Sequence, residues 1–246
     1  MKSSSKNTIR NIVILGDFNP AYYTHLAVNE TTRNLSNRVN NEVQFEWVGT
    51  DQFDFEKELP HKYSGLWISS GSPYKDMDNV LNTIRYAREN KIPTFGNCGG
   101  YQHMLIEYAR NVCGLINADS EETNPESKDL IISKLSCSLV GEKEEISITS
   151  PSLLFSLVGK KNLTGKYHCN YTLNPKYIPI LQNRGLKMTA TNPDGEIRAF
   201  EIPSHPFFIG TLFQPALTST ANEPNPILTG FVSTVHFGYH NVAIKK

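Results

Sequence analysis

The stretch from Ile92 to Leu105 constrains the fold most, because a short apolar run ends there in a glycine-flanked cysteine and a helical pattern follows. The segment Gly96-Asn97-Cys98-Gly99-Gly100 is typical of a nucleophile elbow, a tight turn between a strand and a helix, with cysteine in place of serine. Glycines on both sides permit strained dihedrals and close approach of a substrate. At the start of a helix, the helix dipole favours the thiolate form of Cys98. The alternative interpretation is a buried structural cysteine.

Strand and helix patterns alternate around this elbow. Apolar runs at 11–16 and 66–71 indicate buried strands, and apolar residues spaced three and four apart at 28–39 and 77–87 indicate helices. This alternation predicts an α/β fold with a mostly parallel sheet flanked by helices. Since ligands bind such sheets at the carboxyl ends of the strands, we expect Gly71 and Cys98 to face one pocket.

The second half of the chain predicts an added antiparallel region. Its expected elements are strands at 130–140, 145–149, 186–191, 196–202 and 207–213, and a closing helix at 226–237. Cys137 is expected in the core of the first of these strands. No linker-like segment interrupts the chain, so a single domain over 9–238 is predicted, with tails at 1–8 and 239–246.

Composition excludes several classes of function. Lysine plus arginine and aspartate plus glutamate both number 24 in the 246 residues, so the neutral chain has no electrostatic attraction for nucleic acid or an anionic membrane. The four cysteines are widely spaced, which argues against a disulfide framework or zinc ribbon and fits a cytoplasmic location. No cofactor or metal is predicted, since a cluster of His168, Cys169 and Cys137 lacks a metal-binding spacing. The sequence does not predict the oligomeric state.

The chain also resembles a known family. Residues 84–102 and 106–115 around the elbow, and residues 194–196 and 201–210 later in the chain, closely resemble the glutaminase domain of CTP synthase, a class I (triad-type) glutamine amidotransferase. The resemblance covers roughly residues 10–237 and implies the flavodoxin-like fold of that family. It also implies a stand-alone glutaminase-like protein with a small-molecule substrate, glutamine-like or another amide, and a separate synthetase partner.

The resemblance assigns roles to individual residues. Cys98 corresponds to the nucleophile that attacks the glutamine side-chain amide, and Gln102 to a residue that contacts the substrate. The backbone N–H groups of Gly71 and Gly99 correspond to donors of the oxyanion hole. Glu122 corresponds loosely to the carboxylate that binds the substrate's amino group.

Three positions depart from the family pattern. Where the family has a catalytic histidine and glutamate in Phe-His-Pro-Glu, this chain has Gln214 and Ala216, which can neither carry a proton nor orient a base. Asn170 stands where the family has an arginine for the substrate carboxylate. Since loss of a general base costs about 10²–10⁴ in rate, we predict little ordinary glutaminase activity.

A rebuilt site is one interpretation of these departures. His168 lies in the segment that the resemblance brings to the pocket, and imidazoles titrate near neutral pH, so it is a candidate base toward Cys98. A surface histidine is the alternative. The preferred function is a cysteine-dependent hydrolase or amidotransferase-like activity on an amide or related C–N bond. A catalytically inactive small-molecule-binding or regulatory protein is the alternative.

Overall fold

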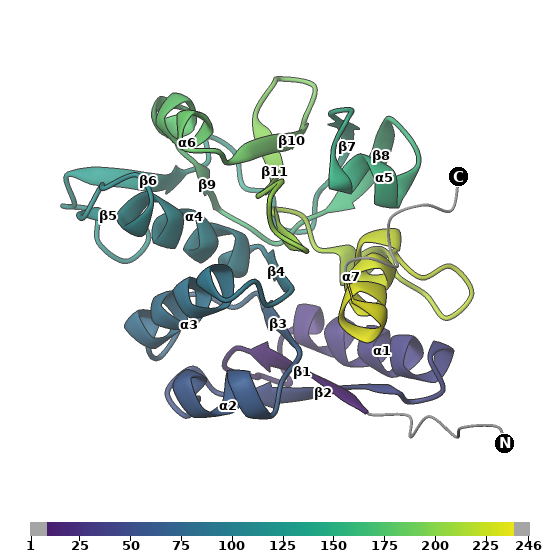
Figure 1. Cartoon of the computed structure of the whole chain (residues 1–246). Coiled ribbons are helices and arrows are strands. Elements are labelled where there is room, and N and C mark those ends of the chain that lie inside the picture. The colour runs from purple at the N-terminus through teal and green to yellow at the C-terminus, as the bar shows by residue number, and fades with distance from the viewer. Residues whose placement is uncertain (1–8, 239–246) are drawn as a thin grey trace, which may run out of the picture.

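A nine-stranded sheet runs through the centre of the protein in the computed structural model, which describes residues 9–238 (Figure 1). The predicted tails at 1–8 and 239–246 lie outside the described residues. In spatial order the strands are β2 (Val43–Val48), β1 (Arg10–Leu15), β3 (Gly65–Ile68), β4 (Thr94–Asn97), β12 (Phe208–Thr211), β11 (Ile197–Glu201), β10 (Lys187–Thr191), β7 (Lys143–Ile148) and β8 (Asn162–Lys166).

The direction of pairing changes at β12. Strands β2, β1, β3, β4 and β12 pair in parallel, whereas β11, β10, β7 and β8 continue the sheet by antiparallel pairing. The predicted α/β class, with a parallel half and an antiparallel hairpin region, is therefore confirmed. A smaller three-stranded sheet contains β5 (Ala118–Ser120), β6 (Asp129–Lys134) and β9 (Tyr171–Leu173).

Helices cover both faces of the parallel half (Figure 1). On one side lie α2 (Phe55–His61), α3 (Met77–Glu89) and α4 (Gly99–Asn111), and on the other lie α1 (Tyr23–Arg38) and α7 (Pro226–Phe237). Shorter elements are α5 (Leu153–Val158), α6 (Ile178–Asn183) and the 3₁₀ turns η1 (Pro175–Tyr177) and η2 (Pro215–Thr218). Among the described helices, none is both long and apolar enough to cross a membrane.

Burial on both faces explains why the central strands are continuous apolar runs. Every residue of β3, β4 and β12 is buried, as are the last four residues of β1. Helices α3 and α4 are further joined by a charged pair, in which the Arg88 guanidinium donates to both carboxylate oxygens of the fully buried Glu107. The helix that follows the elbow is thereby held against its neighbour.

The strand predicted at 130–140 is shorter in the structure. Strand β6 ends at Lys134, because its antiparallel partner β9 pairs only with Ile132–Lys134. The chain then leaves the sheet, and Cys137 is exposed in the following loop. The prediction that Cys137 is a core strand residue is wrong. Among residues 9–238, no group of three or more His, Cys, Asp or Glu side chains is placed to hold a metal ion.

Substitution of Gly100 tests how closely α4 packs on β3. A Cβ atom at Gly100 would clash with the carbonyl oxygen of Ile68, which is backbone and cannot move aside easily. We expect Gly100→Ala to lower the free energy of unfolding by at least about 2 kcal/mol, measured by urea denaturation. Gly141→Ala is the control, because no atom lies within 4 Å of its Cβ position and only its φ of +80° opposes the substitution. Equal stability of the two variants would contradict the argument.

Candidate functional site

The backbone of Cys98 is strained in the way that a nucleophile elbow requires. Cys98 lies between β4 and α4 with φ +51° and ψ −108°, a conformation that non-glycine residues rarely adopt. Its N–H donates to the carbonyl of Thr211 at 2.9 Å, and its carbonyl accepts from the N–H of Gln102 at 3.1 Å. The ends of β12 and the first turn of α4 thus hold the strained residue from both sides.

The glycines of the elbow allow neighbouring segments to approach it. A Cβ atom at Gly96 would clash with Met104 on α4. A Cβ atom at Gly99 would lie only 3.1 Å from the Cβ of Ser72, in the loop after β3. The loop that follows β3 therefore lies directly against the start of α4, as the shared carboxyl edge of the strands predicts.

Six of the predicted site residues line one cavity of about 210 Å³: Gly71, Cys98, Gln102, Glu122, His168 and Asn170. Gly99 lies next to it at the first position of α4. The structure therefore brings together the residues that the sequence spread over a hundred positions. Gln214 and Ala216 are not among the lining residues.

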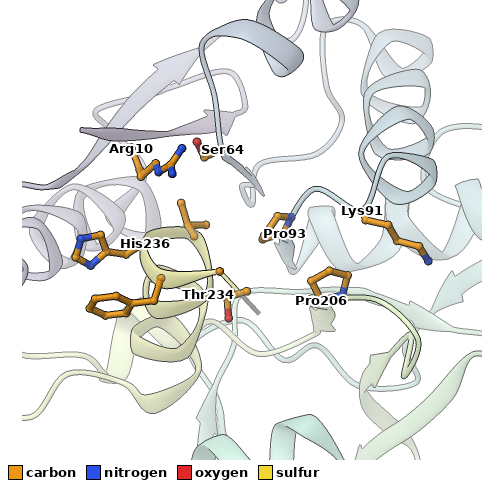
Figure 2. Close-up of a pocket in the computed structure, with 10 residues that line it drawn as sticks. Arg10, Ser64, Lys91, Pro93, Pro206, Thr234 and His236 are labelled. Atoms are coloured by element: carbon orange, nitrogen blue, oxygen red, sulfur yellow. The ribbon is translucent and has the colours of Figure 1, made fainter. Parts of the chain in front are cut away.

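A larger hollow of about 360 Å³ lies at the opposite end of the parallel strands (Figure 2). Figure 2 shows Arg10, Pro93 and Pro206 around it; Arg10 begins β1, Pro93 immediately precedes β4, and Pro206 lies two residues before β12. None of its lining residues within 9–238 is a cysteine, and ligands of such sheets bind at the carboxyl ends of the strands. We therefore assign the candidate site to the smaller cavity at Cys98.

The charge of the cavity comes from Glu122. Its Oε2 accepts a hydrogen bond from the Ser72 hydroxyl at 3.1 Å, and Ser72 packs against Gly99, so the carboxylate is one side chain away from the elbow. None of the residues within 9–238 that line the cavity is a lysine or an arginine. After burial, the charges of Cys98, Asp17 and Glu122 raise the pKa of the enclosed Tyr74 hydroxyl further.

His168 contacts Cys98 through its backbone. The Cys98 thiol donates to the His168 carbonyl, with a sulfur–oxygen distance of 3.4 Å. The exposed imidazole is instead hydrogen-bonded through Nδ1 to the Tyr23 hydroxyl, at 3.1 Å. Burial raises the pKa of Tyr23, and the neighbouring Cys98 and Cys169 raise it further.

Gln214 and Ala216 are built into the core beside the elbow. The Gln214 side chain is buried, and its Oε1 accepts a 3.4 Å hydrogen bond from the Asn97 amide. The side-chain oxygen of Asn97 in turn accepts from the indole N–H of Trp67 at 2.7 Å. Ala216 is buried at η2, where its carbonyl accepts from the Thr31 hydroxyl. Neither side chain provides an ionisable group next to Cys98.

His25, which the sequence did not single out, orients the peptide before Gly71. The N–H of Asn19 donates to His25 Nδ1 at 3.0 Å, so the ring proton lies on Nε2, which donates to the Ser70 carbonyl at 2.9 Å. Burial of His25 lowers its pKa and favours this neutral form. Because the Ser70–Gly71 peptide is trans, the N–H of Gly71 points away from His25.

The two candidate oxyanion donors have no competing acceptor. No hydrogen bond within residues 9–238 uses the N–H of Gly71 or of Gly99. Gly71 has φ +110°, and a Cβ there would lie 2.9 Å from His25 Nε2, so only glycine fits comfortably. Tyr23 and His25 were missed at the sequence level, because they carry no motif and come near the elbow only through folding. Cys169 was considered there only as a metal ligand.

The chain is similar to known proteins over most of its length. The family model for glutamine amidotransferase class-I matches residues 26–234. A CTP synthase from Saccharolobus solfataricus is 29% identical over 94% of this chain and 46% of its own length. A CTP synthase from Acidobacterium capsulatum is 34% identical over 77% of this chain and 37% of its own length. The chain therefore spans less than half the length of these curated relatives.

Solved structures agree with this assignment at the level of the fold. The glutaminase domain of Trypanosoma brucei CTP synthase with bound acivicin superposes with a TM-score of 0.83, at 23% identity, and the match covers 92% of this chain and 93% of that one. A glutamine amidotransferase from Thermotoga maritima has a TM-score of 0.60 at 11% identity, covering 96% of this chain and 99% of that one. The family match and the shared fold lead to one conclusion: this chain belongs to the class I glutamine amidotransferases and is related to the glutaminase domain of CTP synthase.

Proposed function

We propose that Cys98 is the nucleophile of a hydrolase or amidotransferase-like reaction on a small amide or a related C–N compound. The observation that carries this proposal is the strained Cys98 backbone at the floor of a cavity. Such strain persists only where surrounding structure enforces it, and it clusters at functional sites. In this reaction the Cys98 sulfur attacks the carbonyl carbon, the nitrogen leaves with a proton, and water then hydrolyses the thioester.

The oxyanion of the tetrahedral intermediate is stabilised by backbone groups. Gly71 and Gly99 flank the elbow, and their N–H groups have no other acceptor among the described residues. His25 is a positioning residue for this hole, because its hydrogen bond to Ser70 sets the orientation of the Gly71 N–H. Donors that are oriented in advance stabilise developing charge without reorganising during the reaction.

The charge of the cavity indicates the class of ligand. Glu122 supplies a carboxylate, whereas Asn170 is neutral and no lysine or arginine lines the cavity within residues 9–238. A ligand with an ammonium group and no carboxylate fits this distribution better than free glutamine, whose carboxylate would remain unpaired. Gln102 binds the ligand's polar groups from the first turn of α4. A separate synthetase subunit remains the proposed partner if released ammonia is used for CTP formation.

The proposed reaction needs a group that carries a proton to and from Cys98. The resemblance implies that Gln214 and Ala216 replace the family's base and its orienting carboxylate, and neither reaches the cavity. We assign the base to His168, which lines the cavity and whose imidazole is hydrogen-bonded to the Tyr23 hydroxyl. The same departures favour a second candidate function, a binding or regulatory protein that keeps the pocket without turnover.

Reaction with an electrophile separates the two functions. We expect a chloromethyl ketone that carries an ammonium group and no carboxylate to form one covalent adduct that intact-mass spectrometry detects and Cys98→Ala abolishes. Cys137→Ala is the control, because Cys137 is the exposed thiol and its loss should leave the adduct unchanged. Non-covalent binding by calorimetry without any adduct would favour the binding protein instead.

The rate of ammonia release from glutamine tests whether the absence of a general base limits the activity. Enzymes typically turn over at about 10 s⁻¹, and loss of a general base costs about 10²–10⁴, so we expect glutamine hydrolysis below about 0.1 s⁻¹. The double variant Gln214→His with Ala216→Glu should raise this rate if the pocket still accepts glutamine. Wild-type turnover near 10 s⁻¹ would mean that another group already supplies the base.

Substitution of His168 tests its proposed role. Once a substrate is found, His168→Ala should lower kcat by at least about tenfold, because the proton would lose its carrier. Tyr23→Phe keeps the edge-to-face ring contact with His168 but removes the hydrogen-bond partner of the imidazole, so it should change the pH profile more than the fold. An unchanged kcat in His168→Ala would exclude the imidazole as the base.

If His25 positions the oxyanion hole, its substitution should weaken only reactions that form an oxyanion. His25→Leu should weaken binding of a substrate-like aldehyde, whose hemithioacetal carries the oxyanion, by about 10²-fold. Alkylation by iodoacetamide needs no oxyanion hole and should keep its rate. His25→Gln retains an amide donor toward Ser70 and should restore the affinity. If both reactions slow equally in His25→Leu, the histidine only supports the fold.

A further inference from the structure

Cys169 is a second thiol in the candidate site that the proposed reaction does not use. It lines the same cavity as Cys98 but is only 4% exposed, and no disulfide links the two residues. The remaining cysteines lie elsewhere. Cys113 is buried against the carbonyl of Ile180, and Cys137 is exposed in the loop after β6.

The two thiols are anchored by adjacent residues on two chain segments. Cys98 donates its S–H to the carbonyl of His168, the residue immediately before Cys169. At the end of β12, the Cys98 N–H donates to the carbonyl of Thr211, and the Cys169 S–H donates to the carbonyl of Leu212 at 3.5 Å. Both cysteines therefore lie against the same pair of segments.

The two thiols also influence each other electrostatically. Burial raises the pKa of Cys169 well above its usual range, and the neighbouring Cys98 raises it further. Cys169 is thus held as a neutral thiol beside the sulfur of Cys98. We place the first oxidation at Cys98 because it is the slightly more accessible thiol, with 7% of its surface exposed against 4% for Cys169.

We propose that Cys98 and Cys169 form a redox-active dithiol, which a hydroperoxide converts to a Cys98–Cys169 disulfide. In the first step the Cys98 sulfur attacks the peroxide, the O–O bond breaks, and Cys98 sulfenic acid and an alcohol or water form. In the second step the Cys169 sulfur attacks the sulfenic sulfur, and the S–S bond forms as water leaves. Each thiol loses one proton, and the peroxide accepts both electrons.

The disulfide would inactivate the site and protect Cys98 from further oxidation. Bonding to Cys169 removes the nucleophile of the proposed hydrolase and prevents its further oxidation to sulfinic acid, which thiols do not reverse. A thiol reductant restores both cysteines. Cys169 thus acts as a resolving cysteine, a role that goes beyond the hydrolase or binding function proposed above and does not depend on either.

The test uses hydrogen peroxide on the full chain without substrate. We expect the intact mass to fall by about 2 Da, peptide mapping to link the peptides of Cys98 and Cys169, and dithiothreitol to reverse the change. Cys137→Ser should behave like the wild type. Cys169→Ser should instead accumulate Cys98 sulfinic acid, a gain of about 32 Da that dithiothreitol does not reverse.

Two results would overturn the proposal. One is a wild-type protein in which peroxide takes Cys98 to sulfinic acid without a link to Cys169. The other is a link from Cys98 to Cys137 or between two chains. A thermal melt of Cys169→Ser shows whether that variant folds, and the wild-type link stands as evidence even if it does not. Because no substrate is present, failure of the hydrolase proposal leaves the outcome unaffected.

Discussion

The candidate site depends on the strained backbone of one residue. Cys98 has φ +51° because β4 must turn at once into α4 while α4 lies close enough to β3 that no side chain fits at Gly100. A residue in this region of dihedral space costs about 1–3 kcal/mol, so the surrounding packing must outweigh it. The hydrogen bonds of Cys98 to Thr211 and Gln102, and the buried charged pair between α3 and α4, supply that constraint.

The elbow also organises the groups around the thiol. Ser72 packs on Gly99 and binds Glu122, so a carboxylate lies beside the nucleophile without a lysine or arginine in the cavity lining within residues 9–238. This arrangement disfavours an anionic ligand and favours a cationic one. On the other side, His25 holds the Ser70 carbonyl and turns the Gly71 N–H away from itself. The carboxylate of Glu122 and the oriented N–H of Gly71 therefore come from different segments that meet at the elbow.

The groups near Cys98 offer it few proton carriers. The buried Gln214 accepts a hydrogen bond from Asn97 and cannot ionise. The Cys98 thiol donates to the His168 carbonyl, and Cys169 lines the same cavity. These groups suit a thiol that is protected and switched more than one that turns over rapidly, which is why the hydrolase and dithiol proposals need separate experiments.

Much of the fold was predictable from sequence, because hydrophobic periodicity is local. The strands predicted at 11–16 and 66–71, the helices at 28–39 and 77–87, the hairpin of β10 and β11, and the closing helix at 226–237 are all present, whereas α2 was not predicted and α1 begins five residues early. The strand expected at 130–140 was wrong because its length depends on the partner β9, which is short and remote in sequence. Short elements such as β5, β8 and α6 carry too few residues for a period to be visible.

For the site, the sequence by itself determined the elbow around Cys98, since glycine spacing is a local requirement of the turn, and it identified residues that line one cavity. Only the tertiary structure decided which groups touch the thiol. It directed the His168 carbonyl, and not its ring, to Cys98 and brought Cys169 beside it. It also placed Tyr23 and His25 of α1 at the elbow, although they lie more than seventy positions earlier in the chain. These contacts depend on how distant segments pack, which no local pattern records.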